Sequence, residues 1–258
     1  MSLDDSQIER YARHIVLKEV GGAGQQSLLK ARVLVIGAGG LGSPLIMYLA
    51  AAGVGTIGVV DDDTVSLSNL QRQVLHDTAR LGMSKTESAA ESVARLNTDV
   101  RIVRHDMRID AENAGDLVAG YDIVCDGTDN FATRFIVHDA CFHQGRPLVS
   151  AAVVRFDGQL TVWRGHEAGK PCLRCLFREV PAEDTTCAVD GVLGALAGVM
   201  GALQATETIK EILGIGDSMA GQLLIYDGLA ATFRKVRVRP DPACPLCADT
   251  GGKARSAA

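Results

Sequence analysis

Four of the seven cysteines in this chain stand in two pairs with the spacing of metal ligands. Cys172 and Cys175 form one Cys-x-x-Cys knuckle, and Cys244 and Cys247 form a second. Two such knuckles supply the four thiolates of a closed, tetrahedral zinc site. A redox dithiol would account for one knuckle alone, but two knuckles favour Zn²⁺. Because no coordination position stays open, the ion would be structural and would tether the C-terminal end of the chain to the strand-rich half before it.

A glycine-rich turn directly after an apolar run is typical of a nucleotide-binding site. The apolar run covers residues 33–36, and the glycines that follow are Gly37, Gly39, Gly40 and Gly42. Glycine lets the backbone turn sharply and approach a phosphate, and the helix that begins after Gly40 directs unpaired N–H groups at that phosphate. A second apolar run, 56–60, is followed by Asp61, where a carboxylate can bind ribose hydroxyls. Taken alone, this pattern suggests a nicotinamide or flavin cofactor.

Two cations further along the chain favour a triphosphate over a dinucleotide. Arg72 lies in the polar segment 68–73, and Lys85 follows thirteen residues after Arg72. The extra charge of a triphosphate needs cations and amides, and an arginine can bind two phosphate oxygens at once. Either residue alone could be a solvated loop charge, but the pair favours ATP as the ligand. The residues expected around the triphosphate are Ser68, Asn69, Leu70, Gln71, Arg72 and Lys85.

An acidic segment, 126–130, follows the predicted strand at 121–125. Ligands of parallel sheets bind beyond the carboxyl ends of the strands, so Asp129 should face the same crevice as the glycine turn. A carboxylate in that place can hold Mg²⁺ against phosphate oxygens. Asp129 could instead cap the helix predicted to begin at Asn130, and the two roles can coexist.

The elements that position these residues alternate in the first part of the chain. Helical spacing of apolar residues predicts a helix at 4–20, and Ser84 should cap the helix that carries Lys85. The predicted strands are 32–37, 56–60, 100–105, 121–125 and 147–153, and the helices between them are 40–52, 84–96, 110–119 and 130–143. Strands separated by helices form a parallel sheet wound on both faces, so we predict a Rossmann-like, doubly wound α/β fold.

The pattern changes after about residue 150. Two apolar runs, 148–154 and 158–163, flank a short polar turn and should form adjacent antiparallel strands. The remaining predicted segments are a Cys- and Pro-rich loop at 165–187, a helix at 191–213, and strands at 222–226 and 231–238. We therefore expect antiparallel strands to extend the mainly parallel sheet.

Composition narrows the possible partners. The 258 residues, 47% of them hydrophobic, can bury a full core. A net charge of −5 and a pI near 5.7 argue against a nucleic-acid partner. The N-terminus does not resemble a targeting peptide, and the apolar stretch at 191–203 is too short to span a membrane, which takes about 20 apolar residues. We therefore expect a cytoplasmic protein without a membrane partner.

Several motifs, in their order along the chain, resemble the ThiF/MoeB/HesA family, bacterial relatives of ubiquitin-activating enzymes. These motifs are the segments 10–14, 37–42, 69–73 and 128–130 and the two cysteine knuckles. The resemblance implies ATP-dependent adenylation of the C-terminal glycine of a ubiquitin-like sulfur carrier protein that ends in Gly-Gly. The products of that reaction are an acyl-adenylate and pyrophosphate.

The resemblance also implies a role for each candidate residue. Gly40 and its neighbours would line the ATP site, Asp61 would hold the ribose and Asp129 would position Mg²⁺. The residues that would contact the triphosphate are Asn69, Arg72 and Lys85. These roles suit the chemistry, because nucleotidyl transfer is catalysed largely by positioning and by neutralising developing charge.

Two further residues gain a role only from the resemblance. Arg13 matches an arginine that reaches from the N-terminal helix into the ATP site of a partner subunit, which implies a homodimer; its spacing alone also fits a surface charge. Cys187 matches a cysteine that in some relatives takes up acyl or sulfur groups after adenylation, and relatives that finish at the adenylate do not need it. Cys125 and Cys141 fit core positions.

The family pattern predicts a single ThiF-type adenylating domain over 1–258. Its predicted parts are an N-terminal helical arm (1–30), a nucleotide-binding half (31–154), a carrier-binding, zinc-containing half (155–247) and a flexible tail (248–258). No rhodanese-like segment is present, so the persulfide donor should be a separate protein.

The identity of the carrier stays open. The best match implies a MoaD-like carrier of molybdenum cofactor biosynthesis, and the alternatives are the thiamine carrier ThiS or another sulfur carrier. Two other classes of function compete with adenylation. A nicotinamide oxidoreductase would leave Arg72, Lys85 and Asp129 unused, and a non-catalytic, zinc-stabilised module would bind a ubiquitin-like protein without activating it.

Overall fold

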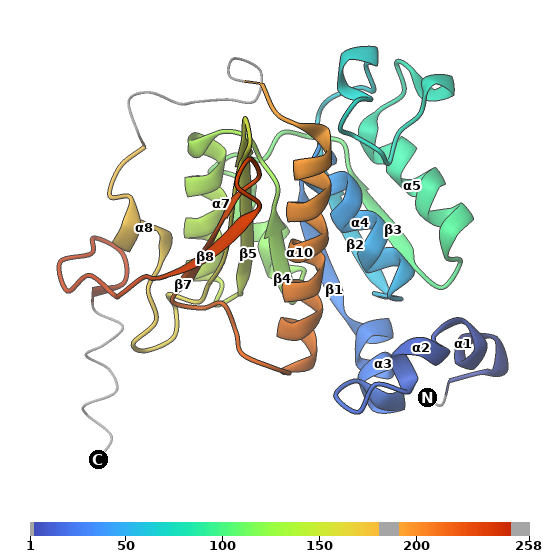
Figure 1. Cartoon of the computed structure of the whole chain (residues 1–258), viewed down its shortest axis with the longest axis horizontal. Helices are drawn as coiled ribbons and strands as arrows, with labels where there is room; N and C mark the ends of the chain where they lie inside the picture. The colour runs from blue at the N-terminus through green and yellow to red at the C-terminus, as the bar shows by residue number, and fades with distance from the viewer. Residues whose placement is uncertain (1–2, 181–190, 249–258) are drawn as a thin grey trace.

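The computed structural model describes residues 3–180 and 191–248, and one mixed sheet organises them (Figure 1). The strands are β1 (Arg32–Ile36), β2 (Thr56–Val60), β3 (Arg101–His105), β4 (Ile123–Asp126), β5 (Leu148–Val154), β6 (Asp157–Trp163), β7 (Gln222–Asp227) and β8 (Thr232–Arg237). Their order in the sheet is β3-β2-β1-β4-β5-β6-β7-β8. Strands β1 to β5 are parallel, and β6, β7 and β8 each run antiparallel to the strand before. The predicted fold class is confirmed.

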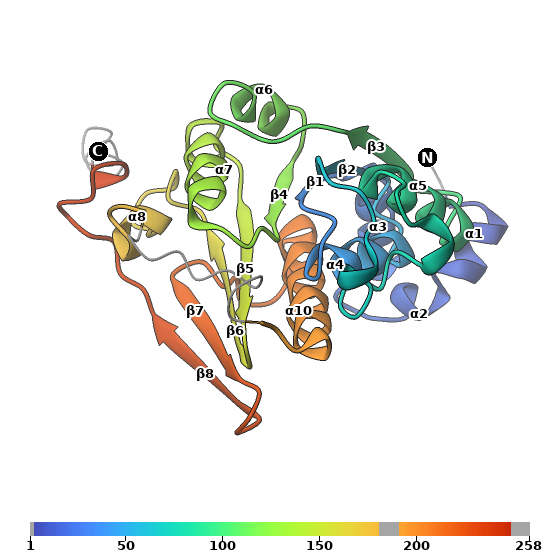
Figure 2. The same cartoon turned by 90° about the horizontal axis from the view of Figure 1, so that it is seen from above.

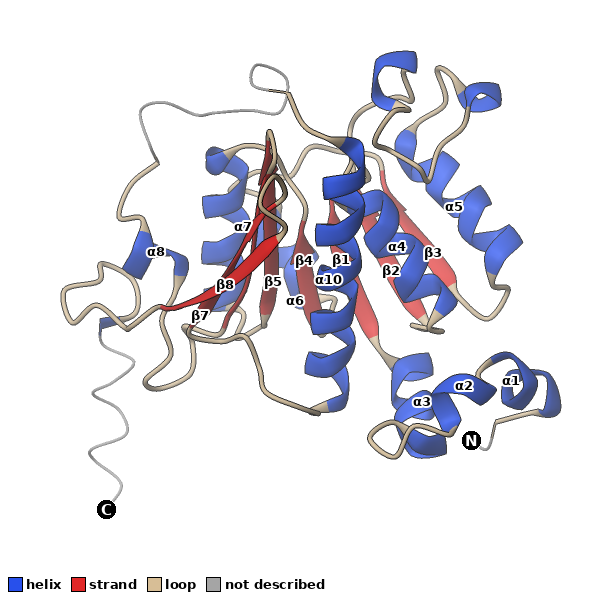
Figure 3. Ribbon diagram, viewed as in Figure 1, coloured by secondary structure: helices blue, strands red, loops and turns tan. Residues whose placement is uncertain are grey.

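Helices cover both faces of the parallel half (Figures 2 and 3). The helices are α1 (Asp5–Arg10), α2 (Ala12–Ile15), α3 (Gly21–Lys30), α4 (Gly42–Ala51), α5 (Lys85–Leu96), α6 (Ala114–Ala119), α7 (Phe131–His143), α8 (Leu173–Leu176) and α10 (Gly194–Leu213), with 3-10 turns η1 (Leu67–Asn69) and η2 (Thr78–Arg80). Helices α4, α5 and α10 pack on one face, and α6 and α7 pack on the other. Within the described ranges, no helix is long and apolar enough to cross a membrane.

The central strand β1 is buried on both faces. Val33 and Val35 belong to the core that α4 and α10 cover, whereas Leu34 and Ile36 belong to the core that α6 and α7 cover. Side chains alternate along a strand, so one apolar run fills two cores. This burial fixes the carboxyl end of β1, where the glycine turn starts, in the middle of the sheet.

The single helix predicted at 4–20 is wrong. Two short helices, α1 and α2, take its place, and α3, which was not predicted, follows them. Tyr11 separates α1 from α2 because its backbone (φ −100°, ψ 13°) leaves the helical region. Gly21, with φ +60°, turns the chain into α3. The sequence of α3 is rich in glycine, but Leu28 is fully buried, so tertiary packing overrides a weak helix propensity.

Two predicted helices begin three or more residues later than expected. Helix α6 starts at 114 rather than 110, because the Asp110 carboxylate accepts hydrogen bonds from the N–H groups of Glu112 (2.9 Å) and Asn113 (3.0 Å) and forms a turn first. Helix α10 starts at 194 rather than 191, after Gly191 with φ +78°. Neither shift moves a candidate site residue to another element.

Candidate functional site

The glycine turn joins β1 to α4 with a very close backbone approach. Gly37 has φ +88°, a conformation that side chains disfavour. A Cβ atom on Gly42, the first residue of α4, would collide with the carbonyl oxygen of Gly37. Both positions therefore require glycine, as the motif predicted, and Gly42 acts by allowing the helix to pack against the turn.

A pocket with a volume of about 470 Å³ opens beside the turn, at the carboxyl ends of the parallel strands. This volume lies in the usual range for small-molecule sites. The predicted residues that line it are Gly37, Gly39, Gly40, Asp61, Asn69, Arg72, Lys85, Asp129 and Asn130. Four other predicted residues do not line it: Gly42 at the start of α4, and Ser68, Leu70 and Gln71 in the segment that carries Arg72.

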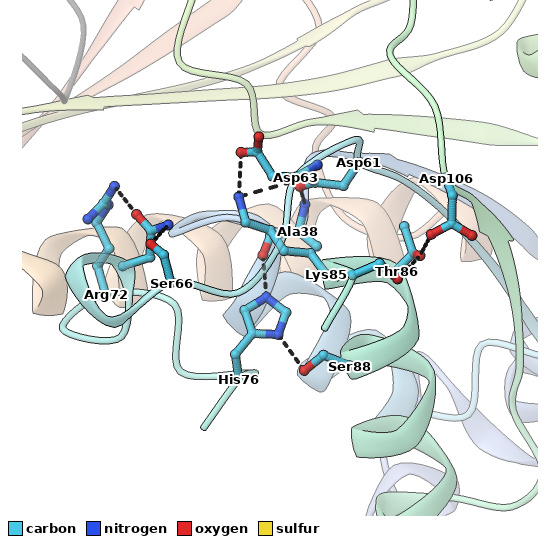
Figure 4. Close-up of polar contacts among 12 residues, drawn as sticks. Ala38, Asp61, Asp63, Ser66, Arg72, His76, Lys85, Thr86, Ser88 and Asp106 are labelled. Atoms are coloured by element: carbon cyan, nitrogen blue, oxygen red, sulfur yellow. Dashed lines mark hydrogen bonds and ion pairs between the residues drawn. The ribbon is translucent and has the colours of Figure 1, made fainter. Parts of the chain in front are cut away.

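Lys85 lies at the pocket between two carboxylates (Figure 4). Its Nζ is 2.8 Å from Oδ2 of Asp63 and 3.8 Å from Oδ1 of Asp61. Asp61 also accepts a hydrogen bond from the N–H of Ala38 in the turn (2.8 Å). Burial raises the pKa of Asp61, and the charge of Lys85 opposes that rise. The lysine and the glycine turn therefore share one carboxylate.

The start of α5 is anchored on both sides of Lys85. Ser84 caps the helix as predicted, because its hydroxyl accepts from the N–H of Glu87 (3.2 Å). Thr86 hydrogen-bonds Asp106, which directly follows β3 (Figure 4). These contacts fix the direction in which the buried Lys85 side chain leaves the helix.

The second cation, Arg72, is held by its own segment. Its Nη2 donates to Oδ1 of Asn69 (3.1 Å) and its Nη1 donates to the carbonyl of Ser68 (3.3 Å). Asn69 in turn donates to the hydroxyl of Ser66 (2.7 Å). The stem of Arg72 passes beside Gly40, within 3.4 Å of the place where a Cβ would be. The structure thus brings Arg72 to the glycine turn.

The loop after β4 corrects one expectation. Asn130, rather than Asp129, caps α7, because its Oδ1 accepts from the N–H of Thr133 (2.9 Å). Asp129 precedes the cap and is exposed at the pocket. Its carboxylate is therefore not needed for the helix.

A buried ion pair that the sequence did not reveal supports this loop. Asp126 is fully buried and accepts from Nε of Arg134 (3.1 Å), the N–H of Thr128 (2.9 Å) and the hydroxyl of Ser150 (2.9 Å). Arg134 lines the pocket and donates from Nη2 to the carbonyl of Thr128 (2.9 Å). A charged residue at the end of an apolar strand was the available signal, since a buried carboxylate needs a partner.

Other pocket residues also escaped the sequence reasoning. Gln73 lines the pocket and is 4% exposed, and its Oε1 has no hydrogen-bond partner within the described ranges. Asp157 and Gln159 reach the pocket from β6. The antiparallel pairing of β5 with β6 brings them there, and no local motif marks them.

One predicted residue, Arg13, lies away from the pocket, and another, Cys187, is not among the described residues. Arg13 is exposed on α2, and α1 to α3 lie at the opposite end of the sheet from the glycine turn (Figure 1). Arg13 does not line the pocket of its own chain. Cys187 lies outside the described residues.

The two cysteine knuckles meet beside α8. Their four sulfurs lie within 4.8 Å of one another, with Sγ separations of 3.9 Å for Cys172–Cys175, 3.5 Å for Cys172–Cys244 and 3.3 Å for Cys175–Cys247. A tetrahedral zinc site with bonds near 2.3 Å places its sulfurs roughly 3.8 Å apart. Burial raises the pKa of Cys172 and that of Cys247, the latter to about 12, so thiolates at these two positions need a cation. Although burial opposes them, hydrogen bonds lower the pKa of Cys244. The donor set fits zinc.

The topology and the pocket place this chain among Rossmann-like proteins, whose ligands lie at the carboxyl edge of the parallel strands. A family model narrows that class. The model of the ThiF family matches residues 11–246, so the chain belongs to the ThiF family. The resemblance that the motifs indicated is confirmed.

Named relatives are similar over nearly the whole chain. The SAMP-activating enzyme E1 of Haloferax volcanii is 49% identical over 253 residues, which cover 97% of this chain and 93% of that protein. The sulfur carrier protein adenylyltransferase of Thermus thermophilus is 46% identical, with 94% and 92% covered. The adenylyltransferase and sulfurtransferase MOCS3 of Bos taurus is 51% identical, with 96% of this chain and 55% of the relative covered. The chain thus spans just over half of that longer protein.

Solved structures show the same fold. The crystal structure of E. coli MccB with MccA-N7isoASN has a TM-score of 0.82 and 22% sequence identity, covering 95% of this chain and 75% of that chain. The crystal structure of E. coli MccB with ATP has a TM-score of 0.81 at 22% identity, with the same coverage. At this identity, the likeness concerns the architecture alone.

Proposed function

We propose that this ThiF-family protein is an adenylyltransferase that uses ATP to activate the C-terminal glycine of a ubiquitin-like sulfur carrier ending in Gly-Gly. One observation carries the proposal: Arg72, Lys85 and Asp129 line the same pocket as the glycine turn. A dinucleotide oxidoreductase has no use for this set of charges. The Haloferax and Thermus relatives carry names of the same kind over comparable lengths.

In the proposed reaction, the carrier carboxylate attacks the α-phosphorus of ATP. A new O–P bond forms to the adenylyl group, and pyrophosphate leaves with the electron pair of the broken P–O bond. The N–H groups at the start of α4, Arg72 and Lys85 neutralise the charge that builds on the phosphate oxygens. Asp61 holds the ribose. Mg²⁺, when bound at Asp129, would add positive charge to the same oxygens.

We propose a homodimer in which Arg13 serves the site of the partner subunit. Arg13 is exposed and does not line its own pocket. Val16 is 72% exposed and Leu17 is 49% exposed, so apolar surface lies next to this arginine. We expect the Arg13→Ala variant to keep its fold but to lose adenylation. Mixing it with Lys85→Ala subunits should restore part of the activity, because one hybrid site then has both side chains; no recovery would contradict the exchange of arginines.

Exchange of labelled pyrophosphate into ATP, with a panel of purified carriers, tests the proposed function. We expect exchange with one carrier, first of all a MoaD-like carrier of molybdenum cofactor biosynthesis and next the thiamine carrier. Exchange should disappear when the terminal glycine is removed. Lys85→Ala and Arg72→Ala should lose about 100-fold or more in rate. Arg95→Ala is the matched control, because Arg95 lies on the same helix and is 64% exposed.

The competing functions predict different results. Exchange with no carrier would contradict the proposal. Carrier binding without exchange would instead support a binding module, and reduction of a substrate with bound NAD would support an oxidoreductase. In the cytoplasm, where we place the protein, a separate persulfide donor would complete sulfur loading. A Cys187→Ala variant with normal sulfur transfer would exclude a covalent role for that residue.

A further inference from the structure

We propose that His76 is a positioning residue that joins the glycine turn to the two cation-bearing elements of the pocket, and that it does so only as the neutral tautomer with hydrogen on Nε2. This inference rests on the proposed function, because it assigns His76 a part in binding the ATP phosphates. His76 contacts the backbone of the turn and not the reacting atoms.

Three segments that carry pocket residues meet at this ring (Figure 4). His76 is buried, with Nε2 2.9 Å from the carbonyl oxygen of Ala38 and Nδ1 2.8 Å from Oγ of Ser88. Ala38 lies within the glycine turn, and Ser88 lies one helical turn after Lys85 on α5. His76 itself belongs to the segment that carries Arg72. One side chain therefore links the turn, the lysine helix and the arginine segment.

The peptide groups of the turn are held from two directions. The N–H of Ala38 donates to Asp61 (2.8 Å), and the carbonyl of Ala38 faces His76. With both polar groups of Ala38 engaged, the orientation of the peptide units that flank it is determined. The second of these peptide units ends in the N–H of Gly39, and both Gly39 and Gly40 line the pocket. In the proposed function, N–H groups of this turn would bind the phosphates.

Hydrogen-bond chemistry selects the tautomer. A carbonyl oxygen only accepts, so Nε2 of His76 must carry the hydrogen, and Nδ1 must accept from the hydroxyl of Ser88. Arg80 supports this direction, because its Nη1 donates to Oγ of Ser88 (3.1 Å) and an arginine never accepts. Each group thus donates to the next: Arg80 to Ser88, Ser88 to His76, and His76 to the carbonyl of Ala38.

A second proton on the ring would break this order. It would sit on Nδ1, so the hydroxyl of Ser88 would lose the acceptor for its own hydrogen and would have to turn to accept from the ring. Burial lowers the pKa of His76, and the nearby charge of Lys85 acts in the same direction. The hydrogen bond to the carbonyl of Ala38 and the charges of Asp61 and Asp77 oppose that change. Arg80 is itself balanced, since its Nε lies 3.3 Å from Glu91 and 3.5 Å from Asp77. The neutral ring is therefore the form that the folded pocket holds near neutral pH.

Two amide variants separate the two bonds of the ring. The amide of Gln at position 76 reaches roughly as far as Nε2, whereas the amide of Asn reaches roughly as far as Nδ1. His76→Gln should keep the bond to Ala38 and bind ATP nearly as the wild type does. His76→Asn should lose that bond and weaken ATP binding about tenfold, the usual result of one lost hydrogen bond. The loss should appear in KM for ATP more than in kcat.

The pH profile is the second measurement. Wild-type ATP affinity, measured by calorimetry from about pH 5.5 to pH 8, should fall on the acid side as His76 becomes protonated. The affinity of His76→Gln should lack this component, because an amide does not titrate. The titration of ATP is common to both proteins and cancels in their difference. His105→Gln is the control, because His105 also has a lowered pKa but its ring is bonded to Tyr121 (2.8 Å) and not to the glycine turn.

The outcomes separate this inference from the proposed function. Wild-type ATP affinity in His76→Asn, or an unchanged acid component in His76→Gln, would overturn the positioning role. Loss of thermal stability in both variants with normal ATP affinity would show a packing role and overturn it as well. If His76→Asn fails to fold, Ser88→Ala keeps the ring and should still weaken ATP binding. The calorimetric pattern without pyrophosphate exchange would support the inference and contradict the adenylation.

Discussion

Single residues around the pocket are held by buried charges whose partners lie on a neighbouring element. Asp126 illustrates this, because it is fully buried and relies on Arg134 from the next helix. Such a pair contributes little net stability compared with apolar packing, but removing one partner leaves an uncompensated charge. The effect of a substitution here depends on which group remains.

We expect Arg134→Ala to destabilise the protein strongly. Asp126 would remain buried without its cation, a change that costs about 3–5 kcal/mol. Urea unfolding at neutral pH measures the loss. Arg95→Ala removes an exposed ion pair, in which Nη1 of Arg95 lies 4.0 Å from Oε2 of Glu91, and should cost less than about 0.5 kcal/mol. Equal losses in the two variants would contradict the burial argument.

Gln73 and Gln204 are both buried, but we expect their substitution by methionine to change the free energy of unfolding differently. Oε1 of Gln73 has no partner in the described part of the chain, so Gln73→Met removes an unpaired acceptor, and the free energy of unfolding should stay equal or rise. Oε1 of Gln204 likewise has no partner among the described residues, but its Nε2 donates to the carbonyls of Asp126 (2.8 Å) and Val149 (2.9 Å). Gln204→Met leaves both carbonyls without this donor and should therefore lose about 1–3 kcal/mol. Unfolding curves of the two variants test this order, and the reverse order would refute it.

Among the elements, the N-terminal helices depend on one tyrosine. The hydroxyl of Tyr11 donates to Asp99 (3.0 Å) and accepts from Asn97 (2.8 Å), which also holds the carbonyl of Ala50 at the end of α4 (2.8 Å). Gly53 faces the ring so closely that a Cβ there would lie 2.6 Å from it. The N-terminal helices are thus attached to the loops after α4 and α5. These loops lie at the opposite end of the strands from the pocket of the same chain.

Stability should fall at alkaline pH through this tyrosine. Burial raises the pKa of Tyr11 to about 12, whereas an unfolded tyrosine ionises near pH 10. Between these values the unfolded state binds fewer protons than the folded state, so the contribution is present below about pH 10 and is lost as the pH rises. Tyr11→Phe should be less stable at neutral pH but should lack this alkaline loss. Tyr48→Phe, at a residue 57% exposed, is the control; equal alkaline slopes for all three proteins would contradict the prediction.

At the scale of the whole molecule, the sheet has two ends with different supports. Helices cover the parallel end on both faces, while β8 at the other end is exposed along its length. The cysteine cluster joins α8 to residues 244–247, beyond the last strand. A metal at this cluster would therefore stabilise the end of the molecule that has the least apolar burial.

Removal of zinc tests this arrangement. We expect about one zinc ion per chain by atomic spectroscopy, and a lower melting temperature after chelation, because the binding energy of a structural metal adds to the stability of the fold. Cys244→Ser should lose the metal. Cys141→Ala should keep it, since Cys141 lies on α7, is buried in the core and is not part of the cluster. A chelated protein with an unchanged melting temperature would argue against a structural role.

Local sequence was sufficient to predict a feature where one short segment contains both the constraint and the residues that cause it. Gly37 and Gly42 lie five residues apart, and the collision that demands glycine is between them. Ser84 lies next to Lys85 and caps the helix that carries it. The alternation of apolar strands with helices was also sufficient to predict the doubly wound sheet, because the buried strands of such a sheet are apolar on both faces.

Tertiary structure alone decided which side chains meet across the sheet. Asp126 finds Arg134, and His76 finds Ala38 and Ser88, through packing that no spacing rule describes. The break at Tyr11 likewise follows from contacts with residues 97 and 99, although the apolar spacing continues through it. The sequence specified the chemistry of the glycine turn and of each cysteine knuckle, since each lies within one short segment; the fold brings the two knuckles together. Burial and distance, which exist only in the folded molecule, decided the partners of each charge.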